Sequence, residues 1–392
     1  MDSQIEHMNI PSTQRLSENI ALRLVGVALS LGAMGTLAAC SGPNGGHDTG
    51  SIGVSSQSPS GTEQFSLPSP DASLPAPNQA LIGNTDEVLS GLGRLENSSS
   101  AQLFGGAMQF FTMPTSLKEI GSSSDSWNPA SVALESKAGV KSLVVFEPAS
   151  GQNVHELAGS KYNIVTEAYY KYLAASGITD AQLGNVVLMP ELIEGGWTGA
   201  DPNDFAAIIN HQAALFHQTF PNGSATTMID LQPKESGALL GQLQNIQKNA
   251  LASIGVQAFP NGNKISFTQD AKGKLIADVS SYMDPAIITS ISKHAGNLPV
   301  WINTGIPESD GAIKYTTQQR VAIAHAISNV MITVKGQGVK VQFLNLFAQD
   351  KRKTEGSNFD FTPESAKVVL PLLAKECKSL NVELYGFAAT PS

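Results

Sequence analysis

Short apolar runs alternate with longer amphipathic stretches from about residue 105 to the end of the chain. Several runs are continuously apolar, as strands covered on both faces must be, and do not alternate with polar residues. The pattern predicts eight strands, which we place at Met108–Met113, Ser142–Glu147, Asn185–Met189, Thr226–Leu231, Leu275–Tyr282, Pro299–Asn303, Val341–Phe347 and Val382–Phe387.

The stretches between these strands carry helix start signals. Asn203 and Thr317 each precede an apolar-periodic segment, and Thr362-Pro363 is an N-cap followed by proline at the first helical position. Alternating strands and helices predict an α/β fold, a (β/α)8 barrel of the TIM type, over residues 101–392. An open doubly wound sheet is the alternative, although no Gly-rich phosphate-binding turn follows any predicted strand.

The N-terminal quarter of the chain has a different texture. Residues 41–100 are rich in Gly, Ser, Pro, Asn and Thr and lack any helix or strand period, so residues 40–100 are predicted to form a flexible tether. Before this tether, Arg23 precedes an apolar run that ends in Leu37-Ala38-Ala39-Cys40.

This N-terminal segment resembles a bacterial lipoprotein signal, in which small residues precede a cysteine that is lipidated and becomes the new N-terminus. The resemblance implies a signal peptide at residues 1–39, a lipid on Cys40, and attachment to the extracytoplasmic face of the cell membrane. An ordinary secretory signal or a short anchor helix is the alternative. The segment before the apolar run departs from the pattern because it carries Asp2, Glu6 and Glu18.

Polar side chains gather where the predicted strands end, which is where a barrel of this type places its function. The candidate residues at or just after strand ends are Glu147, Glu191, Glu194, Asp230, Tyr282, Asn303 and Asn345, with Trp197 and Trp301 nearby. Carboxylates and amides bind hydroxyl groups, and aromatic rings stack on sugar rings, so this composition predicts a carbohydrate site. Capping of neighbouring helices, or plain solvation, is the alternative for each acidic residue.

The segments YNIVTEAYYKYLAASG and NVVLMPELIEGGW, at residues 162–177 and 185–197, resemble clan A glycoside hydrolases, most nearly the family 26 β-mannanases. The resemblance implies that Glu191 is a general acid/base, that Tyr282 lies beside the nucleophile, and that position 303 is the nucleophile. Pro190-Glu191 and Trp197 match the family motif, whereas Met189 stands in place of its arginine and the histidine is missing. The composition at the strand ends, apart from this resemblance, predicts that the substrate is bound by Trp197, Trp301, Glu147, Glu194 and Asn345.

Asn303 is the main departure from that family, because an amide is a poor nucleophile and carries no charge. A retaining glycosidase needs a carboxylate roughly 5–5.5 Å from the acid/base, and an inverting enzyme needs one roughly 6.5–9.5 Å away. Asp230, Glu147 or Glu308 are the candidates to supply it. The sequence therefore leaves open an active hydrolase, a carbohydrate-binding lipoprotein without catalysis, and a barrel used for protein contacts at the cell envelope.

The formal charge of −9 and the lack of a Lys/Arg-dense stripe argue against a nucleic-acid partner. No cofactor is expected. No metal is expected either, because no ligand pattern is formed by His155, His211, His217, His294 and His325. The partners expected are a polysaccharide or oligosaccharide and, through Cys40, a membrane.

Overall fold

In the computed structural model of the chain, the described residues are 106–121, 141–149, 151–193, 197–230, 236–260, 265–347, 350–351, 357–359 and 361–387. All of them belong to one structural unit, Gln64–Ser392. The predicted signal segment, the tether with Cys40, and Glu194 lie outside this set. Within the described part of the chain, no helix is both long enough and apolar enough to cross a membrane.

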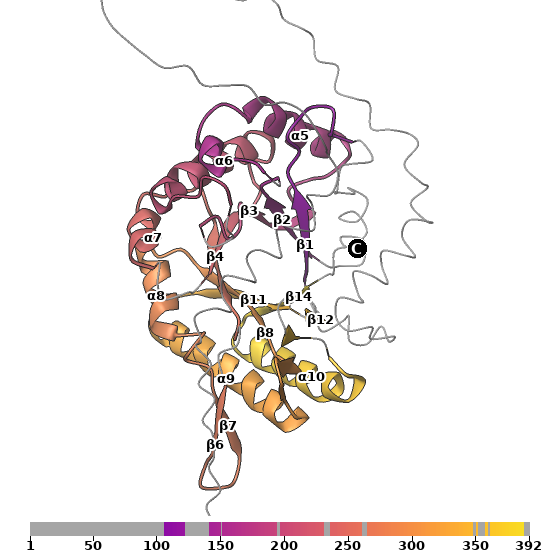
Figure 1. Ribbon diagram of the computed structural model, residues 1–392, viewed down its shortest axis with the longest axis vertical. Coiled ribbons are helices and arrows are strands. Elements are labelled where there is room, and N and C mark those ends of the chain that lie inside the picture. Colours follow the sequence, from indigo (N-terminus) through magenta and orange to yellow (C-terminus); the bar gives the residue numbers. More distant parts are fainter. Residues whose placement is uncertain are drawn as a thin grey trace, which may run out of the picture. The chain divides into compact units, whose positions relative to one another are not determined.

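Eight parallel strands form a closed ring in the order β1-β14-β11-β8-β5-β4-β3-β2 (Figure 1). Every neighbouring pair in the ring is hydrogen-bonded, including β1 with β14. The closure confirms the predicted barrel and excludes the open sheet. The strands are β1 (Gly106–Thr112), β2 (Lys141–Glu147), β3 (Leu183–Leu188), β4 (Ala225–Asp230), β5 (Ser253–Ala258), β8 (Val300–Gly305), β11 (Val341–Phe347) and β14 (Glu383–Phe387).

Helices lie outside the ring of strands (Figure 1). In the described residues they are α5 (Asn163–Ala175), α6 (Phe205–Thr219), α7 (Ser236–Leu243), α8 (Pro285–His294), α9 (Thr317–Gly336) and α10 (Pro363–Ser379), with the short helices η1 (Val154–Ala158) and η2 (Pro202–Asp204). Thr316 closes a capping box with Gln319 at the start of α9, and Thr362 caps α10 before Pro363. Cap chemistry in the sequence therefore indicates both helix starts to within a residue.

One predicted barrel strand is wrong. Leu275–Asp278 forms β7, which pairs antiparallel with β6 (Ser266–Gln269) in a hairpin apart from the ring, and Tyr282 lies beyond its end. The fifth barrel strand is instead β5. Glycine at position 255 weakens the strand pattern of β5, and this glycine is required because a Cβ there would lie 2.2 Å from the Trp301 indole.

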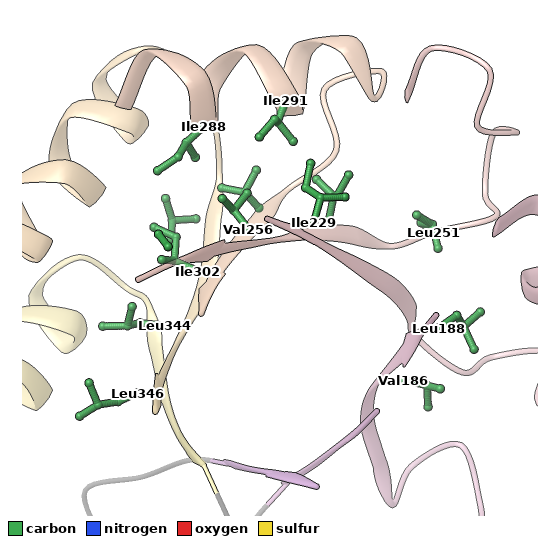
Figure 2. Packing of buried hydrophobic residues seen from close by; sticks show 14 of the residues in the cluster. Val186, Leu188, Ile229, Leu251, Val256, Ile288, Ile291, Ile302, Leu344 and Leu346 are labelled. Carbon is green, nitrogen blue, oxygen red and sulfur yellow. The ribbon is translucent and has the colours of Figure 1, made fainter. Parts of the chain in front are cut away.

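The outer face of the barrel packs against the helices. Alternate residues of each strand point outward, so that Ile302 on β8 and Leu344 on β11 join the large cluster between strands and helices. Figure 2 shows Val256 and Ile229 between the strands and the α8 residues Ile288 and Ile291. This outer layer is the main hydrophobic core of the described chain.

The residues that point inward form a second cluster inside the ring. Trp301, Phe343 and Tyr385 stack across the interior, with centroid separations of 4.9 and 4.4 Å and interplanar angles of 14° and 17°. Glycines on the flanking strands make room at both ends of the stack, since a Cβ at Gly255 or Gly106 would overlap the Trp301 or Tyr385 ring. The barrel interior is therefore a packed floor rather than a channel.

Candidate functional site at the carboxyl ends of the strands

A row of three amide side chains lies one layer above the aromatic floor. Gln257 on β5 is in register with Asn303 on β8, and Asn303 is in register with Asn345 on β11. Trp301 and Phe343 lie two residues before Asn303 and Asn345 on the same strands, so the amides share their inward direction. We call these three residues the amide chain.

Hydrogen bonds join the amide chain head to tail. Asn345 Nδ2 donates to Asn303 Oδ1 at 2.8 Å, and Asn303 Nδ2 donates to Gln257 Oε1 at 2.9 Å. Gln257 Nε2 then donates to Glu191 Oε1 at 2.6 Å. The structure therefore connects Glu191, the expected acid/base, with Asn303, at the position expected for a nucleophile, through Gln257, a residue that the sequence did not single out.

The turn after β3 directs Glu191 toward the amide chain. Met189 and Glu191 both adopt positive φ, 50° and 49°, which is uncommon for residues other than glycine. The turn lets Met189 N donate to Phe146 O on β2 while Glu191 N donates to Met228 O on β4. The turn is thus held by both neighbouring strands, through Met189 on one side and Glu191 on the other, and the Glu191 side chain is half-buried.

Three phenylalanine rings cover the amide chain on its solvent side. Phe259, Phe347 and Phe359 meet edge to face, with centroids 5.3–5.7 Å apart. Phe359 packs on Gly305, where a Cβ would lie 2.4 Å from its ring, and Gly305 is the next inward position after Asn303 on β8. Beneath this phenylalanine cover, Asn303 is 2% exposed and Asn345 is 0% exposed.

A small sheet carries Phe359 into place. It consists of β10 (Ile313–Lys314), β9 (Ser309–Asp310), β13 (Ser357–Asn358) and β12 (Asp350–Lys351), in that order. Across β9 and β13, Ser357 Oγ donates to Asp310 Oδ1 at 2.7 Å and Asn358 Nδ2 donates to Glu308 Oε2 at 2.5 Å. Glu308, a candidate replacement nucleophile, is therefore held by Asn358 in this sheet.

The buried side chain of Arg320 ties the base of the cover to the outer helices. Its guanidinium donates to Ser365 Oγ at 2.7 Å and to Ile306 O at 3.1 Å, and lies 4.1 Å from the centroid of the Phe361 ring. These contacts connect the end of β8 with the first turns of α9 and α10. Phe361 lies two residues after Phe359, so these contacts hold the chain close to Phe359.

Two further carboxylates end neighbouring strands. Glu147 ends β2 and follows the inward residues Leu143 and Val145, while Asp230 ends β4 and follows the inward Met228. Both are half-buried, and the Cα of Asp230 is in register with Gln257. The structure therefore brings Glu147, Glu191 and Asp230 to the same end of three adjacent strands.

Tyr282 and Trp301 do not occupy the positions that were expected. Tyr282 belongs to the outer core rather than to the barrel interior, and burial raises the pKa of its phenol well above the usual range. Trp301 is fully buried in the floor, and its Nε1 donates to Thr226 Oγ1 at 2.9 Å. The expectation that Trp301 stacks on a sugar is wrong, because the indole has no exposed surface.

The remaining predicted binding residues divide between the two layers. Trp197 is half-buried against the outer core. Asn345, which was expected to bind substrate, is enclosed beneath the cover and donates to Asn303 instead. Among the described residues, no group of three His, Cys, Asp or Glu side chains is placed to hold a metal ion.

Gln257 and Phe359 were missed by sequence reasoning. Gln257 was overlooked because β5 was not recognised, although the apolar Ile254 and Val256 precede it at strand spacing. Phe359 lies in a segment without periodicity, and only the pairing of β13 with β9 brings it to the barrel mouth. No signal local to that segment predicts the contact.

No family model matches the chain, and no curated protein matches it in sequence. The structure is similar to solved glycosidase barrels. A family 1 glycoside hydrolase of Thermotoga maritima is 10% identical over 78% of this chain and 87% of its own, with a TM-score of 0.45. A glucosidase from Croceicoccus marinus is 10% identical over 72% of this chain, with a TM-score of 0.44, and the chain spans 63% of that enzyme's length.

A β-1,3-glucanosyltransferase of Rhizomucor miehei, solved as an active-site mutant with laminaritriose, is also similar. It is 14% identical over 59% of this chain and 75% of its own, with a TM-score of 0.38. At these identities and TM-scores the likeness concerns the barrel alone and carries no conclusion about activity.

Proposed function

We propose that the protein is a glycoside hydrolase-like barrel that binds carbohydrate at Glu191 and does not cleave it by a retaining mechanism at position 303. One observation carries this proposal: the Asn303 amide is 2% exposed, and both of its ends are engaged by Gln257 and Asn345. A nucleophile must reach the anomeric carbon of a bound sugar. Asn303 has neither the charge nor the access for that role.

The chemistry of the strand ends supports binding of a polyhydroxylated ligand. Glu147, Glu191 and Asp230 are half-buried there, and carboxylate oxygens accept hydrogen bonds from sugar hydroxyls. Glu191 is held at two points, because its backbone N donates to Met228 O on β4 and its carboxylate accepts from Gln257 on β5.

A second candidate is an inverting hydrolase that uses Glu191 with Asp230 or Glu147. The observation that favours it is the placement of all three carboxylates at the same end of adjacent strands. Such an enzyme would protonate the leaving oxygen from one carboxyl group and activate water with the other. This candidate requires Glu191 or a neighbour to donate a proton at the pH of the reaction.

The experiment that separates the two uses the full chain carrying Cys40→Ser, so that the protein stays free of lipid. Binding to soluble β-mannan and β-glucan is measured together with release of reducing sugar, in the parent and in Glu191→Gln, Asp230→Asn and Glu147→Gln. Binding without turnover in the parent, weakened in Glu191→Gln, supports the proposal. Turnover that is lost in Glu191→Gln and in either partner variant, with a product of inverted anomeric configuration by NMR, establishes the inverting hydrolase instead.

Glu364→Gln is the matched control, because Glu364 is exposed in the first turn of α10. Its binding should equal that of the parent. Equal binding by Glu191→Gln and Glu364→Gln would reject Glu191 as the site.

We further propose that Cys40 is lipidated and holds the barrel at the extracytoplasmic face of the cell membrane. The support is the sequence Leu37-Ala38-Ala39-Cys40 after an apolar run. A single acyl chain binds membranes only weakly, so stable attachment requires more than one chain on the mature N-terminus. Metabolic labelling with a palmitate analogue should mark the parent and not Cys40→Ser; equal labelling of both would reject the anchor.

A further inference from the structure

The hydrogen bonds of the amide chain all donate in the same direction, from Asn345 toward Glu191. At each link the NH2 group points toward Glu191 and the carbonyl oxygen points away from it. An ionised carboxylate only accepts hydrogen bonds, so Gln257 must present Nε2 to it and Oε1 to Asn303. Asn303 must then present Nδ2 to Gln257 and Oδ1 to Asn345.

Two methionine sulfurs support the same direction independently. Asn303 Nδ2 lies 3.5 Å from Met228 Sδ, and Asn345 Nδ2 lies 3.6 Å from Met108 Sδ. A thioether sulfur is a weak acceptor and has no hydrogen to donate. The NH2 groups therefore face the sulfurs as well as the next acceptor, and a reversed chain would turn carbonyl oxygens toward both sulfurs.

We propose that Gln257 is a positioning residue that holds Glu191 as an ionised hydrogen-bond acceptor, which selects neutral polyhydroxylated sugars over anionic ones. Hydrogen bonding to the charged form of a carboxyl group favours that form, and a donor chain in which each amide polarises the next strengthens the effect. The negative charge of an ionised Glu191 itself disfavours an anionic sugar at the same place. The sugar preference rests on the proposed function; the positioning of Glu191 by Gln257 does not.

The titration of Glu191 tests the positioning directly. In the full Cys40→Ser chain labelled with 13C at the glutamate carboxyl carbons, the Glu191 signal is identified by its loss in Glu191→Gln. Gln257→Met removes the donor while keeping an unbranched side chain, and Gln257→Asn keeps an amide that is one methylene too short. We expect both to raise the midpoint of the Glu191 titration by about one pH unit.

Asn303→Leu keeps Gln257 but removes the donor that orients its carbonyl oxygen, so the midpoint should rise by less than in Gln257→Met. An unchanged midpoint in a folded Gln257 variant would overturn the positioning role. If Gln257→Met fails to fold, Gln257→Asn and Asn303→Leu give the same readout.

Binding to neutral soluble β-mannan and to anionic polygalacturonate is measured on the same proteins. Binding to β-mannan alone, weakened in Gln257→Met, supports the sugar preference, and equal binding to both polymers overturns it. A shifted titration without any polymer binding upholds the positioning role and rejects the proposed function. Polymer binding with an unshifted titration upholds the proposed function and rejects the positioning role.

Discussion

Replacing Asn303 by aspartate tests the physical basis of the site. The change is nearly isosteric and introduces a carboxyl group at the position where a retaining enzyme would hold its nucleophile. In its protonated form the new side chain reproduces the amide, because its hydroxyl donates to Gln257 and its carbonyl oxygen accepts from Asn345. In its ionised form it has no donor and would face Gln257 Oε1, unless Gln257 turns and presents that oxygen to Glu191 instead.

The cost of the ionised form follows from burial. Asn303 is 2% exposed beneath the phenylalanine cover, and within the described part of the chain its side chain bonds to Met228, Gln257 and Asn345, none of which is a cation. Leaving an uncompensated buried charge costs about 3–5 kcal/mol. At about 1.36 kcal/mol per pH unit, this corresponds to a rise of about 2–4 units in the pKa of the new carboxyl group, from about 3.9 to between about 6 and 8.

The sign of the pH dependence is fixed by this raised pKa. Above pH 4 the folded variant binds a proton that the unfolded chain has lost, so its stability falls as the pH rises. The difference in unfolding free energy between parent and variant should be near zero at about pH 4. It should grow by about 1.4 kcal/mol per unit and level off at about 3–5 kcal/mol near pH 8.

Urea unfolding followed by tryptophan fluorescence, at several values between pH 4 and pH 8, measures this difference. Asn329→Asp on the exposed side of α9 is the matched control and should differ from the parent by less than about 0.5 kcal/mol at every pH. A difference for Asn303→Asp that is the same at pH 4 and pH 8 would refute the buried amide chain. We also expect no hydrolysis by Asn303→Asp, since the new carboxyl group would still be buried beneath the phenylalanine cover.

Three further outcomes are expected. Gly255→Ala should lower the unfolding free energy by about 1–3 kcal/mol, because the added Cβ would overlap the Trp301 indole. Gly241→Ala, which has open space around it, is the control and should be neutral or stabilising. Equal effects of the two substitutions in thermal unfolding would contradict the packed floor. Phe359→Ala should cost about 3–5 kcal/mol by denaturant unfolding, and a loss below about 1 kcal/mol would show that the cover is not closed. Burial raises the pKa of the Cys377 thiol to about 12. In a Cys40→Ser chain, iodoacetamide at pH 8 should therefore modify Cys377 only after unfolding. Rapid labelling of Cys377 in the folded protein would contradict its burial.

Sequence alone determined the barrel and most of its strands. Continuous apolar runs mark strands that are covered on both faces, and Thr362 marks the start of α10 by a side-chain hydrogen bond to nearby backbone. The cap of α9 is Thr316, one residue before the predicted Thr317. These signals are local, so the residues that produce them lie within a few positions of the element they define. The same locality explains why the glutamate after β3 and the asparagine near the end of β8 were both recognised.

The functional meaning of those residues was decided by tertiary structure. Gly255 weakens the local pattern of β5 for the sake of Trp301, which lies on the neighbouring strand β8, and this hid Gln257. Phe359 reaches Gly305 at the end of β8 because β13 pairs with β9, and Asn303 lies two residues before Gly305 with 2% of its surface exposed. Burial and hydrogen-bond partners depend on contacts between segments that are distant in the sequence, so a local hydrophobic pattern does not predict them. For this reason Asn303, which the sequence suggested as a candidate nucleophile position, is a buried residue hydrogen-bonded between Asn345 and Gln257.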